Sequence, residues 1–249
     1  MTYSSGNTIL ATDYNTFVGT VNTVIGNSAS YQSSAGYAQS TIASVSAAGT
    51  VNASEWATLI AAVKLAATHQ GTTINLPATA LATGNTIEAL DGTTSSSGTY
   101  DLSTAVTNIS ANKNNVDAAA QSTISAANVM TRGTAWTDTI NAEWYIQFAS
   151  QVAADAFFNT GGEIHCSMTH PTGAGAQDVD WRAILQTKIG TMKMSRASFT
   201  RTGSAGTVFN VGYTSLTGTY QSIFTGTNIG AGQYAANDIV FNAKLDTSN

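Results

Sequence analysis

The residues best suited to bind a metal ion in this chain are His165, Cys166 and His170. Thiolate and imidazole groups are good zinc ligands, so their closeness in sequence raises the question of a zinc site. Ile164, Cys166 and Met168 alternate as in a strand, however, which would point His165 and Cys166 to opposite faces. No second cysteine or acidic residue stands at zinc-finger spacing. We therefore predict that Cys166 lies in the core, that His165 lies on the surface, and that they form no metal site.

Three kinds of catalytic or ion-binding chemistry find weak support in the sequence. Cys166 and His170 could form a nucleophile and base, but a buried cysteine is normally inert and no orienting third group can be named. Asp178 and Asp180 offer oxygen ligands for calcium, yet the twelve-position loop with its terminal Glu is absent, and helix capping is the simpler role. The 14 acidic residues show no convincing carboxylate pair for glycoside hydrolysis, and the chain has neither a G-x-S-x-G elbow nor a phosphate-binding loop. The sequence therefore predicts no enzyme, no cofactor and no catalytic residue.

Sugar binding is the other chemistry that the residue types allow. Tyr213, Tyr220 and Tyr234 could stack on sugar rings while nearby Asn, Thr and Ser side chains bond to the hydroxyl groups. Aromatic residues in strands are usually packed, so a role in the core of a C-terminal sheet is favoured. Binding of a surface glycan through these tyrosines stays open as the alternative.

Apolar spacing predicts strands and helices in the C-terminal part of the chain. Trp144, Ile146 and Phe148 alternate as in a half-buried strand. The apolar residues that follow recur at the spacing of one helix face: Val152, Ala153, Ala156 and Phe157. Residues 159–162 should end this helix, because Asn and Gly tolerate the left-handed conformation common at helix ends.

After the strand over 164–168, a second helix should begin at Asp178 or Asp180, whose side chains can accept hydrogen bonds from free N–H groups. One face of it carries four apolar residues: Trp181, Ile184, Leu185 and Ile189. Short strands broken by Gly, Asn and Asp continue to the end of the chain.

The N-terminal half is predicted to be mainly helical. A first helix should begin at Thr12 or Asp13 and end at Gly26, and a second should begin near Asn52 or Ser54 and end at Gly71. Their apolar faces should pack together. Residues 27–49 and 72–100 are rich in loop-forming residues.

Residues 101–130 carry apolar positions in alternating steps of four and three, the spacing of a coiled-coil seam. The seam comprises Leu102, Val106, Ile109, Lys113, Val116, Ala120, Thr123, Ala127 and Met130. A homo-oligomeric coiled coil and a long helix packed within its own bundle both explain it. The second is favoured, because Lys113 and Thr123 weaken a seam.

Composition points to association with other subunits. Charged residues make up 9% of the 249 residues, against roughly 25% in ordinary globular proteins, while 43% are hydrophobic. Such a surface weakens the repulsion that keeps monomers apart. A net charge of −5, with Lys and Arg forming no run, disfavours direct nucleic-acid binding.

Cellular location can also be predicted from the sequence. Cys166 is the only cysteine, which excludes an intrachain disulfide and fits synthesis under reducing conditions. The start, MTYSSGNTIL, lacks the features of a secretory signal, and no apolar stretch is long enough to span a bilayer. We expect synthesis and assembly in the cytoplasm, and no membrane partner.

Several segments together resemble virion proteins of tailed bacteriophages, especially contractile-tailed phages of marine and cyanobacterial kind. The N-terminal segments are ATDYNTFVGTVNTVIG and SEWATLIAAVKLAATHQG, and the C-terminal ones are FFNTGGEI, SMTHPTG, DVDWRAIL, GYTSLTGTYQSIF and YAANDIVFNAKL. The resemblance covers most of the chain and rests on aromatic and glycine positions. It implies membership of a virion, in the tail, neck or baseplate region, and carries over no catalytic or ligand-binding residue.

The sequence thus predicts an α+β protein with a mainly helical assembly region over 1–130 and an α+β domain over 131–249, the latter with a mainly antiparallel sheet and two helices. The expected function is that of a non-enzymatic structural subunit, homo-oligomeric and bound to other virion proteins. A glycan-binding adhesin at a fibre tip or capsid vertex is the main alternative, and a tail-associated hydrolase is a weaker one.

Overall fold

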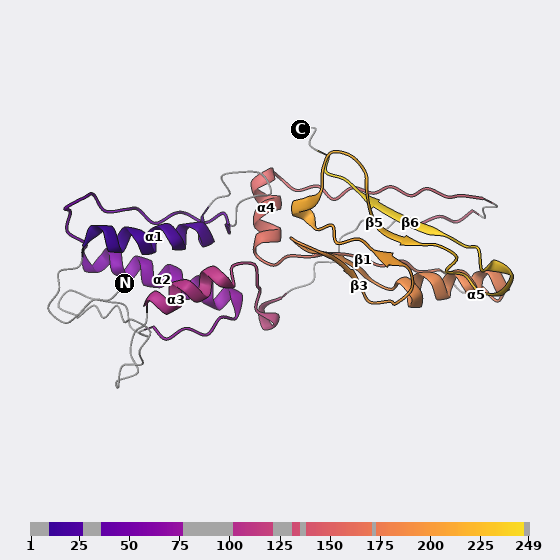
Figure 1. Cartoon of the computed structure of the whole chain (residues 1–249), viewed down its shortest axis with the longest axis horizontal. Helices are drawn as coiled ribbons and strands as arrows, with labels where there is room; N and C mark the ends of the chain where they lie inside the picture. The colour runs from indigo at the N-terminus through magenta and orange to yellow at the C-terminus, as the bar shows by residue number, and fades with distance from the viewer. Residues whose placement is uncertain are drawn as a thin grey trace.

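The computed structural model describes residues 10–26, 36–76, 102–121, 131–134, 138–170 and 173–246. Within these ranges the chain has the expected α+β architecture, with a helical part followed by strands. Figure 1 shows an elongated molecule, in which the helical part occupies one end, the sheets occupy the other, and α4 (Gln151–Asn159) lies between them. Two separate hydrophobic cores correspond to these parts, one built from residues between 14 and 109 and the other mainly from residues between 154 and 245. The domain boundary near residue 131 stays a prediction.

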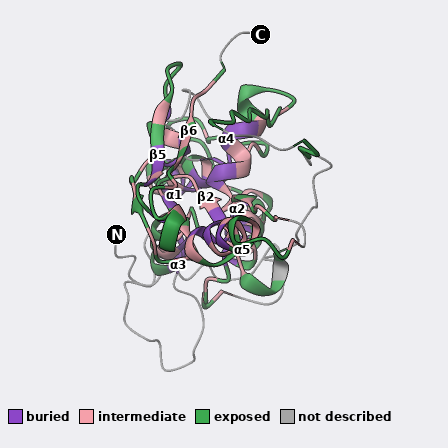
Figure 2. Cartoon of the chain, turned by 90° about the vertical axis from the view of Figure 1, so that its right-hand side faces the viewer, coloured by how far each residue is buried: buried purple, intermediate pink, exposed green. Residues whose placement is uncertain are grey.

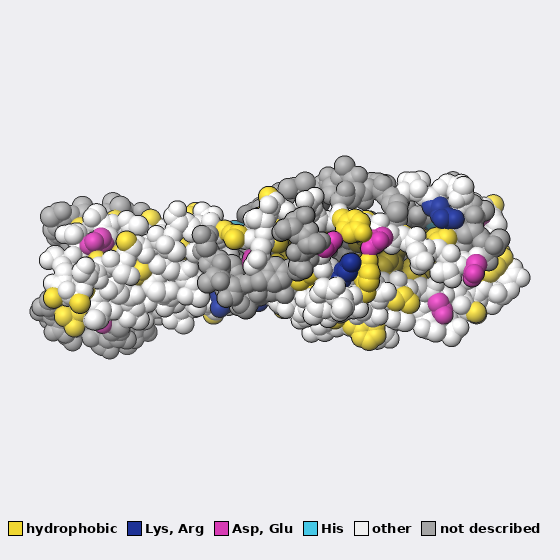
Figure 3. Space-filling model, turned by 90° about the horizontal axis from the view of Figure 1, so that it is seen from above, with side chains coloured by type: hydrophobic (Ala, Val, Ile, Leu, Met, Phe, Trp, Pro, Cys, Tyr) yellow, Lys and Arg dark blue, Asp and Glu magenta, His cyan; other side chains and the backbone are white. Residues whose placement is uncertain are grey.

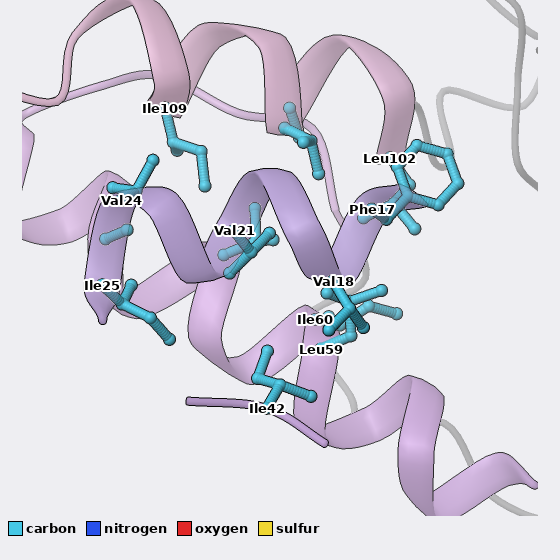
Figure 4. Close-up of a cluster of buried hydrophobic side chains, with 14 of the residues drawn as sticks. Phe17, Val18, Val21, Val24, Ile25, Ile42, Leu59, Ile60, Leu102 and Ile109 are labelled. Atoms are coloured by element: carbon cyan, nitrogen blue, oxygen red, sulfur yellow. The ribbon is translucent and has the colours of Figure 1, made fainter. Parts of the chain in front are cut away.

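Three helices form the first core: α1 (Ala11–Ile25), α2 (Ala53–Gln70) and α3 (Leu102–Ala111). Figure 4 shows side chains of all three converging, with Ile42 from a nearby loop beside them. Val21, Leu59 and Ile109 are completely buried. Burial of each such side chain stabilises the fold by roughly 1.5–3 kcal/mol, so this cluster is the main reason that the helices associate.

The ends of α1 and α2 follow from local sequence, with one correction. Helix α2 begins after Asn52, whose N–H donates to the Glu55 carboxylate at 2.6 Å, and ends at Gly71 in the left-handed conformation. Helix α1 ends before Gly26, as expected. Its predicted start was wrong, because Thr12 and Asp13 lie inside the first turn and Leu10 occupies the cap position.

The predicted long helix over 101–130 is also corrected. Helix α3 ends at Ala111, and the chain then turns and, as far as it is described, to residue 121, forms a short 3-10 helix, η1 (Ala118–Ala120). Leu102, Val106 and Ile109 are buried against α1 and α2, so the intramolecular interpretation holds for this stretch. Lys113 lies beyond the helix, and the predicted seam positions at 123, 127 and 130 lie outside the described residues.

The C-terminal part contains two three-stranded antiparallel sheets among its described residues. In the first, β2 (Met192–Met194) pairs with both β1 (Ile164–Cys166) and β3 (Phe199–Arg201). In the second, here called sheet B, β5 (Gln221–Gly226) pairs with both β4 (Thr207–Val208) and β6 (Ile239–Ala243). Two 3-10 helices lie in the connections of sheet B: η3 (Tyr213–Ser215) between β4 and β5, and η4 (Gly232–Tyr234) between β5 and β6.

The helix after β1 changes its winding at mid-length. It starts as α5 (Ala176–Arg182) and continues as a π-helix, η2 (Ala183–Ile189), with Gly190 N–H bonding to the Leu185 carbonyl at 3.1 Å. Hydrogen bonds five residues apart bring Ile184 and Ile189 to the same face, and both are completely buried. Trp181 and Leu185 pack beside them, which confirms the predicted face.

Helix α4 buries a different face from the predicted one. Its buried residues are Ala154, Asp155, Phe158 and Asn159, whereas Val152 is 39% exposed. Phe158 stacks on Tyr213 with ring centroids 4.2 Å apart, and this contact helps to fix the rotation of the helix. Seen along the long axis, buried residues gather toward the middle of the molecule, including part of α4 (Figure 2).

Asn159 joins the two parts of the molecule. Its amide donates to the Gly36 carbonyl at 3.2 Å and accepts a hydrogen bond from Arg196 Nε at 2.8 Å. Next to it, the Thr160 carbonyl lies 3.0 Å from Nε2 of His69 in α2. The junction is therefore polar and specific, although it is small.

Candidate functional site

The candidate metal-binding residues His165, Cys166 and His170 do not form one site in the structure. His165 is exposed and pairs with Glu163 at 2.8 Å, whereas Cys166 is partly buried against the C-terminal core. Burial raises the pKa of the Cys166 thiol, which disfavours the reactive thiolate. His170 instead lies 3.7 Å from Asp178. The expected positions of His165 and Cys166 are thus confirmed, and in the described ranges no three His, Cys, Asp or Glu side chains are grouped to hold a metal ion.

Asp178 and Asp180 do not cap the helix as predicted. Gly175 occupies the cap position of α5, Asp178 lies in its first turn, and Asp180 lies further along. The Asp180 side chain is buried and accepts a hydrogen bond from Asn237 at 3.1 Å. Asp180 therefore helps to fix the segment before β6 against α5.

The three tyrosines considered for sugar binding have different environments. Tyr213 is buried, and its hydroxyl donates to the buried carboxylate of Asp155 at 2.7 Å. Tyr234 is partly buried in η4, and Tyr220 is 56% exposed just before β5. The favoured core role is thus confirmed for Tyr213, but it is wrong for Tyr220, which lies on the surface.

Tyr220 belongs to a surface cluster that we call the tyrosine cluster, formed by Glu143, Tyr145, Tyr220 and Lys244. The Tyr220 hydroxyl donates to the Glu143 carboxylate, which also interacts with Tyr145. The Lys244 ammonium lies 4.8 Å from the centre of the Tyr220 ring. Figure 3 shows hydrophobic side chains beside acidic and basic ones on the C-terminal half of the molecule. Such a cluster can offer aromatic surface and charged hydrogen-bonding groups to a partner.

The electrostatics of the cluster favour the neutral form of both phenols. The hydrogen bond to Glu143 raises the pKa of Tyr220 to about 12, with burial and the charge of Glu143 as smaller causes. The negative charge of Glu143 also raises the pKa of Tyr145. Both hydroxyl groups therefore stay protonated, and act as donors, at neutral pH.

The segment that carries Glu143 and Tyr145 departs most from its predicted structure. We call residues 138–148 the arm. The predicted strand at Trp144, Ile146 and Phe148 does not form, and the arm runs as a long tube beside the sheets (Figure 1). All residues from 138 to 147 are exposed, with Trp144 at 40% and Ile146 at 44%. Only Phe148 packs inward, 5.4 Å from the ring centre of Phe157.

Sequence reasoning missed most of the tyrosine cluster. Of its members, only Tyr220 was a candidate residue. Glu143 is 77 residues from Tyr220 in sequence, and nothing in its local pattern indicates the contact. Tyr145 lies within the predicted strand, but the pattern of that strand is defined by the apolar residues on either side of Tyr145. The apolar alternation of the arm was the one signal that could have marked this surface.

No helix in the described part of the chain is both long and apolar enough to cross a membrane. No family model, curated protein or solved structure matches this chain.

Proposed function

We propose that this protein is a structural subunit of a tailed-bacteriophage virion, in its tail, neck or baseplate region, and that it acts by assembling with copies of itself and with other virion proteins. The observation that carries the proposal is a surface with few charges and many exposed apolar side chains. Among the described residues, eleven large hydrophobic side chains are exposed, while charged residues make up 9% of the chain.

The distribution of these side chains supports assembly more than their number does. Single exposed apolar residues are normal on soluble proteins, but clusters mark interaction sites. Four of the eleven lie within the arm: Ile140, Trp144, Tyr145 and Ile146. The resemblance of the chain to phage virion proteins supports the particle as the place of assembly.

Immunogold labelling of purified phage particles from a lysate that contains this protein tests the proposal. An antibody raised to the chain should label the neck, tail or baseplate in electron micrographs. Particles that carry no label, whether intact or disrupted, would contradict a virion role, provided that the antibody detects the purified chain.

Glycan binding at a fibre tip or capsid vertex is a second candidate, and the tyrosine cluster favours it. Tyr145 and Tyr220 expose aromatic surface beside a carboxylate and an ammonium group, which are groups suited to sugar recognition. A glycan array with the purified chain separates the two functions. Saturable binding that is lost in Tyr220→Ala, together with label confined to fibre tips, would favour the adhesin over the structural subunit.

A further inference from the structure

The arm has the sequence pattern of a strand but pairs with no strand in the described part of the chain. From Ile140 to Phe148 every even position is apolar, and the odd positions between them are polar or tyrosine. This alternation is typical of a strand with one buried face. In the structure Ile140, Trp144 and Ile146 remain 39–44% exposed. Sequence and structure disagree here in the way that they do at functional surfaces.

Sheet B has an open edge of the matching kind. Strand β6 is the outermost strand of this sheet among the described residues, and its five residues make it the longest edge strand of either sheet. Ile239, Phe241 and Ala243 are partly buried, while Val240 and Asn242 are exposed. The strand itself contains no charged residue or proline, which are common protections of an edge against pairing.

The arm and this edge are not paired within the chain. The arm is held at the end of sheet B by the contact between Glu143 and Tyr220, which precedes β5. No ladder joins the arm to β6, although Figure 1 shows the arm running beside the C-terminal part. Among the described residues, each chain therefore presents one amphipathic segment and one sheet edge that no strand ladder pairs.

We propose that the arm of one copy adds as a strand to the β6 edge of a second copy. Main-chain hydrogen bonds would supply affinity, and Trp144 and Ile146 would become buried at the contact. Because the two surfaces differ, the contact is head-to-tail and repeats from copy to copy, which builds a ring or an open filament. Because the chain carries few charges, electrostatic repulsion between copies opposes this contact only weakly. This inference rests on the proposed function, because it names the surfaces through which the proposed self-assembly occurs.

Sedimentation velocity of the full chain over a concentration series tests the role of the side chains. The double variant Trp144→Ser and Ile146→Ser should weaken self-association at least about tenfold, because both side chains are central to the contact. Leu65→Ser is the matched control, since Leu65 is 65% exposed in α2, far from the arm in sequence, and its loss should leave association unchanged. Equal association of the double variant and the wild type would overturn the inference, as would a wild-type chain that stays monomeric throughout.

Hydrogen exchange tests the main-chain pairing without assuming its register. Amides over 138–148 and 239–243 should exchange more slowly in the assembled wild type than in the dilute chain, and the double variant should lose this protection. Assembly without added protection in these segments would overturn strand addition. If the chain is found in particles but arm variants still assemble normally, strand addition is wrong and the proposed function stands. If assembly depends on the arm but the chain is absent from particles, the proposed function is wrong and strand addition stands.

Discussion

Tyr213 and Tyr220 show how position decides the role of a single side chain. Both hydroxyl groups donate to a carboxylate, but Tyr213 does so in the core and Tyr220 on the surface. A hydrogen bond to a charged group contributes most where water cannot replace it. Tyr213 is therefore expected to matter for stability, and Tyr220 for the conformation of the arm.

Tyr213→Phe should lower the free energy of unfolding by about 1.5–3 kcal/mol, because buried Asp155 loses a charged hydrogen bond while the ring can still stack on Phe158. Urea unfolding measures the change. Tyr234→Phe is the control, since Tyr234 is only partly buried, and it should change the free energy by less than about 0.5 kcal/mol. Similar effects of the two substitutions would contradict the core role of Tyr213.

Glu143→Gln should lower the pKa of Tyr220 from about 12 toward the ordinary value of 10.0, because the carboxylate that accepts the hydrogen bond from the Tyr220 hydroxyl is lost. The folded pKa is raised, so the stabilising contact is complete below pH 10, weakens as pH rises above it, and is lost through about pH 12. The ultraviolet absorbance of tyrosinate during a pH titration, compared with that of Tyr220→Phe, assigns the transition. An unchanged titration in Glu143→Gln would show that the contact does not form in solution.

At the scale of elements, helix ends are set by single residues with distinct backbone requirements. Gly71 ends α2 with φ of 65°, a conformation that costs other residues roughly 1–2 kcal/mol. Gly19 lies on the exposed side of α1, where an added Cβ would meet no atom within 4 Å. The same substitution should therefore have opposite effects at the two positions.

Gly71→Ala should destabilise the protein by roughly 1–2 kcal/mol, whereas Gly19→Ala should stabilise it by up to about 1 kcal/mol through helix propensity. Thermal unfolding followed by circular dichroism gives both changes. An added Cβ at Gly71 would meet Asp117 only at 3.4 Å, so the expected loss comes from backbone strain and not from a clash. Destabilisation by both substitutions would argue against this assignment.

At the scale of the whole molecule, two small cores meet at the polar junction around Asn159, and the arm remains exposed. The two cores are separate clusters of buried side chains. If neighbouring copies cover the exposed surfaces, assembly adds stability by mass action.

The melting temperature of the wild-type chain should therefore fall on dilution, because unfolding is coupled to dissociation. Scanning fluorimetry over a hundredfold range of protein concentration measures this dependence. The double variant Trp144→Ser and Ile146→Ser should show a smaller dependence. A melting temperature that is independent of concentration, with a well-behaved monomer, would count against a subunit that depends on its neighbours.

Local pattern was sufficient for much of the fold. The α+β class, the C-terminal ends of α1 and α2, the start of α2 and the apolar face of the helix after β1 could be predicted, because each depends on residues a few positions apart. The rotation of α4 and the early end of α3 could not. Phe158 is turned inward by Tyr213, a residue distant in sequence, and the predicted apolar step at Val116 lies beyond the end of α3 at Ala111.

By itself, the sequence determined which segments are amphipathic, where helices can end and how few charges the surface carries. Only the tertiary structure decided which amphipathic segments find a partner within the chain. Residues Ile164 to Cys166 form a paired strand, whereas the arm, which has a similar alternation of side chains, does not. The physical reason is that a strand requires hydrogen-bonding partners from elsewhere in the fold, and a pattern of side chains does not say whether the same chain supplies them.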